Sequence, residues 1–138
     1  MEKTLVLIKP DAVERHHCGD IIGIYEREGF RIAAMQMLQM TEKLAAKHYA
    51  EHIGRHYYDG LVKFMTSAPL IAMVLEGEDV ISRVRKINGK TNPAEADEGT
   101  IRKLYAEGGS RNAVHASDSS ESAQREIAIF FSGMEICD

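Results

Sequence analysis

The sequence predicts an α+β fold: a ferredoxin-like βαββαβ core with an antiparallel sheet and additional helices. The first observation is the order of its segments, which run strand, helix, strand, helices, strand, helix, strand and helix. The second is size, because 138 residues of which 44% are hydrophobic can enclose one sizeable core. The third is the lack of a linker or internal repeat, so residues 1–138 are expected to form a single domain.

The expected strands are short segments that end near turn-forming residues. The apolar run before Lys9 and Pro10 is typical of a buried strand, and the run after Pro69 stops at Gly77. A second strand is rich in Met and Ala, and the last is short. The four strands are expected at residues 4–8, 30–40, 70–75 and 112–116.

The expected helices carry apolar residues at three- and four-residue spacing. Thr41 opens one of them, and Gly29 stops the first. They are expected at residues 20–28, from residue 41 onward, and at 57–66, 79–87 and 120–131. Residues 88–111 are expected to form a loop. Loops of this length in compact domains are usually functional or disordered, and the basic and hydroxyl residues of this one favour function.

Composition excludes several classes of protein. Charged residues make up 28%, which argues against disordered, collagen-like and coiled-coil chains. The net charge of −4 does not attract polyanions, so nucleic acid is not an expected partner. The sequence shows no signal peptide or membrane span, which predicts a cytoplasmic protein with no membrane partner. Cys18 and Cys137 are therefore expected to be free thiols.

The strongest chemical signal is the octet at residues 112–119, which contains His115. A neutral imidazole can attack phosphorus, because its pKa lies near neutrality. Ser117 and Asp118 add hydroxyl and carboxylate groups close by, and Glu126 on the following helix could orient the imidazole. On these residues alone, an ordinary histidine beside a helix N-cap remains an equal alternative.

The octet resembles the active-site signature Asn-x-x-His-Gly-Ser-Asp of the nucleoside diphosphate kinase family. Residues 8–13, 89–94 and 99–102 resemble three further segments of that family, in the expected order. The resemblance covers essentially the whole chain, and four ordered motifs are far more specific than one. It implies a ping-pong transfer of the terminal phosphoryl group from a nucleoside triphosphate to a nucleoside diphosphate.

For catalysis, the resemblance implies that His115 is the residue that becomes phosphorylated. Tyr49 and Glu126 would hold its imidazole, and Ser117 would lie near it. Without the family, a core aromatic residue is the favoured interpretation of Tyr49.

For the nucleotide, the resemblance implies that Lys9 and Asn112 meet the sugar hydroxyls and that Tyr57 stacks on the base. The phosphates would be bound by Arg85, Thr91 and Arg102. Taken singly, the same side chains could be solvated charges or core aromatics. Expected substrates include ATP, ADP, GTP and GDP.

The expected cofactor is Mg²⁺, held mainly by the nucleotide phosphates and water, with Asp118 available through a water molecule. No direct protein ligand to the metal is expected. The family resemblance also implies a homo-oligomer, a tetramer or hexamer built from dimers.

Some residues depart from the family pattern. Ala116 replaces the usual Gly after the nucleophile, and we expect it to have an ordinary, negative φ. The pair His56 and Tyr57 replaces Pro and Phe, which keeps an aromatic platform but loses its rigid neighbour. Ala68 replaces a common Gly before Pro69, and residues 108–110 differ from the bulkier run of the family, which leaves the inner wall of the base slot in doubt.

Three other patterns are weaker signals. Gly89, Lys90 and Thr91 end like a P-loop but lack its first glycine and preceding strand. His48, His52 and His56 recur at four-residue spacing, yet no carboxylate or Cys completes a metal site, and a solvated or core face is favoured. The triplet at residues 16–18 is expected to be a loop, because adjacent residues rarely chelate one metal.

Two other functions compete with the kinase. A catalytically weak nucleotide-binding regulatory module would have lost His115, Lys9 or the arginines, and all are present. A phosphohistidine carrier protein would have no need of the expected nucleotide-binding loop.

Overall fold

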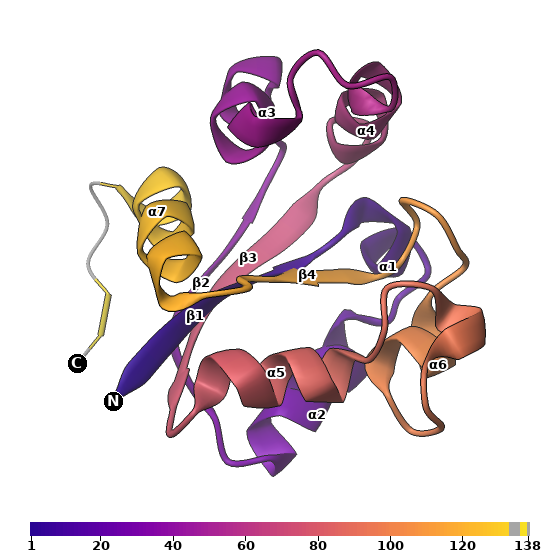
Figure 1. Cartoon of the computed structure of the whole chain (residues 1–138). Coiled ribbons are helices and arrows are strands. Elements are labelled where there is room, and N and C mark those ends of the chain that lie inside the picture. The colour runs from indigo at the N-terminus through magenta and orange to yellow at the C-terminus, as the bar shows by residue number, and fades with distance from the viewer. Residues whose placement is uncertain (133–135, 138) are drawn as a thin grey trace.

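The computed structural model describes residues 1–132 and 136–137. A four-stranded antiparallel sheet forms the centre, with the strand order β2-β3-β1-β4 (Figure 1). Its strands are β1 (Glu2–Ile8), β2 (Arg31–Leu38), β3 (Leu70–Gly77) and β4 (Val114–Ala116). This order, with a helix crossing after β1 and after β3, confirms the predicted ferredoxin-like βαββαβ core.

Two layers of helices cover the two faces of the sheet (Figure 1). One layer contains α1 (Pro10–Glu14), α2 (Cys18–Arg27), α5 (Val80–Asn88) and α6 (Ile101–Tyr105). The other contains α3 (Glu42–His48), α4 (Tyr58–Met65) and α7 (Ser120–Phe131). Short 3₁₀ turns lie at Ala50–His52 and Pro93–Glu95. None of the described helices is both long enough and apolar enough to span a membrane.

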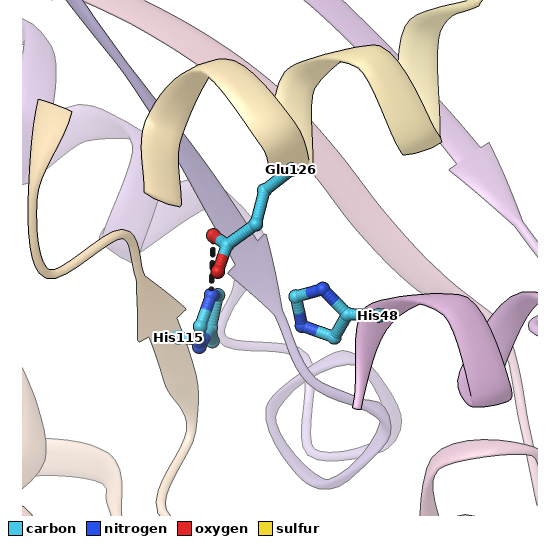
Figure 2. Close-up of side chains that lie close together, drawn as sticks. All are labelled: His48, His115 and Glu126. Carbon is cyan, nitrogen blue, oxygen red and sulfur yellow. Dashed lines mark hydrogen bonds and ion pairs between the residues drawn. The ribbon is translucent and has the colours of Figure 1, made fainter. Parts of the chain in front are cut away.

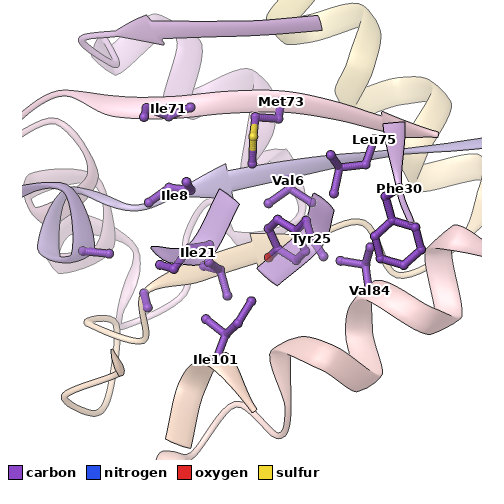
Figure 3. Packing of buried hydrophobic residues seen from close by; sticks show 14 of the residues in the cluster. Val6, Ile8, Ile21, Tyr25, Phe30, Ile71, Met73, Leu75, Val84 and Ile101 are labelled. Carbon is purple, nitrogen blue, oxygen red and sulfur yellow. The ribbon is translucent and has the colours of Figure 1, made fainter. Parts of the chain in front are cut away.

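The central strand β1 is buried on both faces, which explains its continuous apolar sequence. Successive side chains point to opposite faces, so Val6 and Ile8 enter one core while Leu5 and Leu7 enter the other. Figure 3 shows the first core, where Val6 and Ile8 pack with residues of β3, α2, α5 and α6. The strand β1, which is held by both cores, therefore gives β4 a fixed partner in the sheet.

The structure corrects the sequence analysis in the segments around the site. The region 88–111, expected to be a loop, contains α6 and the 3₁₀ turn Pro93–Glu95. Its helix is capped by Thr100, whose side chain accepts a hydrogen bond from the N–H of Lys103, and is anchored by buried Ile101. The helix α1 was not expected either. Pro10 stands in its first turn, where a missing N–H costs nothing.

Two predictions about single residues are confirmed. Ala116 lies in β4, and positive φ among non-glycine residues of the described chain occurs at His16, Asp79 and Ala113 instead. Cys18 and Cys137 are both free thiols.

Candidate active site

The strand β4 fixes the position of His115. It pairs with the central strand, and His115 lies opposite Leu7. The chain then turns into α7, where the side chain of Ser119 caps the helix by accepting a hydrogen bond from the N–H of Ser122. Two turns into that helix, Glu126 comes back to face the histidine (Figure 2).

A chain of buried hydrogen bonds connects the sheet to the imidazole. The N–H of Leu5 donates to Ser117 Oγ over 3.3 Å, and the Ser117 hydroxyl donates to Glu126 Oε1 over 2.8 Å. The same carboxylate oxygen lies 2.9 Å from Nε2 of His115. Burial acts to raise the pKa of Glu126, but the hydrogen bonds and charge of its partners outweigh burial and hold that pKa below the usual value.

These bonds determine which ring nitrogen can react. An ionised carboxylate can only accept, so the proton of a neutral His115 must lie on Nε2. Its lone pair is then on Nδ1, which has no hydrogen-bond partner within the described part of the chain. The arrangement therefore presents an unprotonated nitrogen on the side away from Glu126 (Figure 2).

Nearly all the predicted site residues meet in one cavity of about 450 Å³. Ser117 is the exception, because it is fully buried beneath Glu126. The predicted residues that line the cavity are Lys9, Tyr49, Tyr57, Arg85, Thr91, Arg102, Asn112, His115, Asp118 and Glu126. A larger adjoining cavity of about 870 Å³ shares Arg85, Thr91 and Arg102 with the first. The two arginines therefore lie where the two cavities join.

Lys9 is a buried cation at the inner end of the cavity. Its Nζ donates to Asn112 Oδ1 over 2.8 Å, and the residue is only 7% exposed. Burial, helped by the positive charge of Arg102, lowers the pKa of Lys9 to about 8. Lys9 and Asn112, both expected to meet the sugar hydroxyls, therefore lie side by side, and a bound anion would stabilise the lysine charge.

Ala113 joins this cation to the nucleophile through a strained backbone. Its φ of 72° lies in the left-handed region, which costs a non-glycine residue about 1–2 kcal/mol. The Ala113 N–H donates to Asp11 Oδ2 over 3.0 Å, and its carbonyl accepts from the N–H of Lys9 over 2.8 Å. Asp11, fully buried in α1, thus fixes the turn that leads into β4.

The two arginines are held to different degrees. Arg102 donates to three backbone carbonyls, those of Gly89, Asn112 and Val114, at 2.8, 3.4 and 2.9 Å. Arg85 has one long bond of 3.4 Å, to the carbonyl of Ala116. Arg102 therefore ties the loop to β4, whereas Arg85 keeps its guanidinium largely available for a ligand.

Gly89 shows why the P-loop resemblance is misleading. Gly89 ends α5 with a φ of 85°, and a Cβ at this position would lie 2.6 Å from Thr100 Oγ1. A residue without a side chain is therefore required at position 89, so that the loop can pack closely against the start of α6. No strand precedes it, as the sequence analysis expected.

The aromatic residues lie as predicted only in part. Tyr57 lines the same cavity as His115 and is 42% exposed. Its hydroxyl contacts Nδ1 of His52. Tyr49 also lines the cavity, but its buried hydroxyl has no partner among the described residues and its ring packs against His48. The predicted direct hold of Tyr49 on His115 is therefore not seen, and one ring separates the two.

Sequence reasoning missed His48 as part of the site. The spacing of three histidines had grouped it with His52 and His56, but the structure turns His48 inward against His115, with ring centroids 4.8 Å apart. The described residues form one possible metal-binding group, made of His48, His115 and Glu126. A useful signal was the apolar face of α3, on which His48 falls in register with buried Ala45.

Asp118 is suited to a hydrated cation. Its carboxylate lines the cavity, and a hydrogen bond from the Ser122 hydroxyl lowers its pKa. The group is thus ionised at neutral pH and open to solvent. Such a carboxylate fits Mg²⁺, which keeps several waters when it binds through few protein groups.

Comparisons with known proteins identify this arrangement. The family model described as nucleoside diphosphate kinase matches residues 2–136. A nucleoside diphosphate kinase of Clostridium perfringens is 50% identical over 140 residues, covering 99% of this chain and 98% of the relative. Another, from Methanothermobacter thermautotrophicus, is 55% identical over 137 residues, with 99% and 91% covered.

A solved structure agrees with these sequence matches. The crystal structure of the Aquifex aeolicus nucleoside diphosphate kinase superposes with a TM-score of 0.94 at 46% identity, covering 98% of each chain. With fold, site and sequence in agreement over nearly the whole length, the chain belongs to the nucleoside diphosphate kinase family.

Proposed function

We propose that the chain carries out the reaction of its family by using Nδ1 of His115 as the nucleophile. The observation that carries this proposal is the bond of 2.9 Å between His115 Nε2 and Glu126. It leaves the Nδ1 lone pair directed away from Glu126 in a cavity lined by cations. Phosphoryl transfer depends mainly on alignment and charge neutralisation, and this site offers both.

The reaction takes two steps. Nδ1 attacks the terminal phosphorus of a nucleoside triphosphate, and the bond from that phosphorus to the bridging oxygen breaks, so the diphosphate leaves with the oxygen. A second diphosphate then attacks the phosphohistidine with a terminal oxygen, and Nδ1 recovers its electron pair. The imidazole is positively charged while phosphorylated, and the carboxylate of Glu126 at Nε2 stabilises that charge.

Three cations would surround the phosphates. Arg85 and Arg102 lie where the two cavities join, and Thr91 lines both cavities there. Lys9 lies deeper, beside Asn112, where it would meet the sugar hydroxyls and part of the phosphate charge. When bound with the nucleotide, Mg²⁺ supplies further positive charge to the phosphate oxygens, and Asp118 would hold one of its waters.

The base would stack on Tyr57 at the outer end of the cavity. Every base has a π face, so stacking does not select among them. The rings of His52 and His56 lie against that of Tyr57, and stacking on this aromatic group would accept any base. ATP, GTP and the other nucleoside triphosphates, with their diphosphates, are therefore the proposed substrates.

We propose further that the chain, acting as one domain over residues 1–138, works as a cytoplasmic homo-oligomer. The edge strand β2 pairs only with β3 in the described structure, and it exposes Met35 and Met37 to 50% and 59%. Exposed apolar side chains on an edge strand favour pairing with another chain. Mass measurement in solution would distinguish a tetramer or hexamer of dimers from a monomer.

Incubation with γ-labelled ATP in the absence of a second nucleotide tests the proposed function. We expect acid-labile label on the protein, followed by transfer to added GDP. His115→Gln should take up none, and His16→Asn serves as the control because His16 lies on an exposed turn outside the cavity. A regulatory module would bind nucleotide without labelling, and neither the site nor the relatives favour that alternative.

A further inference from the structure

His48 is a buried titratable residue that the proposed reaction does not use. It ends α3, is 4% exposed, and neither ring nitrogen has a hydrogen-bond partner among the described residues. A neutral imidazole has one donor and one acceptor, and buried polar groups are nearly always satisfied. The His48 imidazole therefore has both ring nitrogens free, among the described residues, to meet water or a ligand.

The surroundings of His48 limit what that ligand can be. Phe130 and Tyr49 pack against the ring at centroid distances of 5.1 and 4.5 Å. Toward the cavity, its ring meets that of His115 nearly at right angles, with Glu126 beside both (Figure 2). His48, His115 and Glu126 each offer one ligand atom, and these atoms lie within 4.8 Å of one another.

Two imidazoles and one carboxylate form a recognised ligand set for Zn²⁺ with an open fourth position. Zinc bonds to nitrogen and oxygen are about 2.0–2.2 Å long, so modest side-chain shifts would bring the three atoms around one ion. The cavity of about 450 Å³ that all three residues line gives the ion a path and room for water. Mg²⁺ would not compete strongly, because it prefers oxygen ligands and octahedral geometry.

We propose that His48, His115 and Glu126 form an inhibitory site for Zn²⁺. The ion takes the place of the proton on His115 Nε2, where Glu126 otherwise accepts a hydrogen bond. A neutral imidazole bound to a metal through Nε2 carries its single proton on Nδ1. The displaced proton thus ends, through water, on Nδ1 and occupies the lone pair needed for attack on phosphorus. Binding is independent of the proposed function, whereas the inhibition rests on it.

Metal binding is measured first, on the protein without nucleotide. Titration of the metal-free chain with Zn²⁺ alone should show one ion bound per chain. His48→Gln should weaken binding at least tenfold, while His16→Asn removes an exposed histidine from an unrelated turn and should leave it unchanged. Equal affinity in His48→Gln and wild type would overturn the site, as would the lack of binding by the wild type.

A spectroscopic measurement does not depend on how well the variant folds. Co²⁺ added to the wild-type chain should give the intense visible bands of a four-coordinate ion, and Zn²⁺ should displace it. If the chain gave nothing but the weak spectrum of six-coordinate Co²⁺, that result would contradict a site with two imidazoles and a carboxylate.

Inhibition is measured with excess Mg²⁺ and a fixed ATP and GDP concentration. We expect stoichiometric Zn²⁺ to lower the exchange rate at least tenfold in the wild type, a chelator to restore it, and His48→Gln to lose this sensitivity. Bound Zn²⁺ with an unchanged rate would overturn the inhibitory role. A wild type that binds Zn²⁺ but never exchanges phosphate would instead refute the proposed function.

Discussion

The two ends of the cavity are held in different ways. At the nucleophile end, Glu126 is 4% exposed and Ser117 is fully buried, and both take part in hydrogen bonds that reach the central strand. At the base end, Tyr57 is 42% exposed, and among the described residues its hydroxyl contacts only His52. Bond making needs alignment within a fraction of an ångström, whereas stacking tolerates movement. Rigidity is therefore concentrated where the phosphorus must be attacked.

The largest expected effect comes from removing the nucleophile. His115→Ala should fold but lose exchange by at least about 10⁴-fold, since it removes the imidazole that Glu126 orients for attack. Phosphorylation of GDP by ATP and acid-labile phosphate on the protein are the measurements. Label retained by the variant would mean that another of the six histidines is the nucleophile.

The two arginines should separate rate from stability. Arg85→Ala and Arg102→Ala should each lower kcat/KM at least tenfold, or about 1.4 kcal/mol of transition-state stabilisation. Arg102→Ala should also lower the melting temperature, because three backbone carbonyls lose their donor, while Arg85→Ala should leave it nearly unchanged. Equal melting temperatures would show that the bonds of Arg102 contribute little to stability.

The sequence predicted the core better than the segments around the site. Strand β3 and helix α7 were found because apolar spacing and turn residues mark them clearly, and residues 120–131 were predicted without error. Helices α1 and α6 have five residues each, too few to show a period. These helices are stabilised by tertiary contacts: Asp11 of α1 accepts a hydrogen bond from the N–H of Ala113, and Ile101 of α6 is buried in the core.

The same distinction applies to the site residues. The octet marks His115 as a candidate, and the family resemblance supplies its role in catalysis as well as the roles of the other residues. His48 could not be identified as a neighbour of His115, because 67 positions separate them in sequence and only the fold brings α3 to α7. The left-handed backbone of Ala113 has no signal in the residue type, since alanine rarely adopts it.

Lys9 should set an upper pH limit on the exchange activity. With the pKa lowered to about 8, the free enzyme loses this positive charge as pH rises through that value, so kcat/KM should fall above pH 8. The limit on kcat should lie at higher pH, because bound phosphates stabilise the charge. Lys9→Arg should be slower but lack this limit, and an identical limit in the variant would assign it to another group.

The effect of Lys9 on stability should change with pH in the opposite direction to its effect on kcat/KM. Its folded pKa of about 8 lies below the ordinary lysine value of 10.5, so the unfolded chain binds more protons between these values. From this group alone, the free energy of unfolding should therefore rise with pH over that window. Urea unfolding of wild type and Lys9→Met at pH 8 and 10 would measure the difference.

The base end should tolerate change. Tyr57→Phe removes only the contact with His52, so KM should change less than about threefold, whereas Tyr57→Ala removes stacking worth about 1–3 kcal/mol. ADP, GDP, CDP and UDP should serve as acceptors at comparable rates in the wild type. A preference of several hundredfold for one base would mean that side chains of the cavity form specific hydrogen bonds to that base and that stacking alone does not explain binding.

The smallest expected effect is at Ala116, where the family usually has glycine. Ala116 lies in β4 opposite Val6, with the extended backbone that alanine adopts without strain, so glycine is not needed for its conformation. Ala116→Gly should then leave the exchange rate nearly unchanged and cost roughly 0.5–1 kcal/mol of stability, because glycine loses more freedom in a strand. The residue is 5% exposed and lines the cavity, so the added methyl groups of Ala116→Val would crowd the space beside His115 and lower the rate. A large gain in rate with glycine would mean that backbone freedom beside the nucleophile limits the reaction, and the rigidity of this end of the cavity would then hinder catalysis.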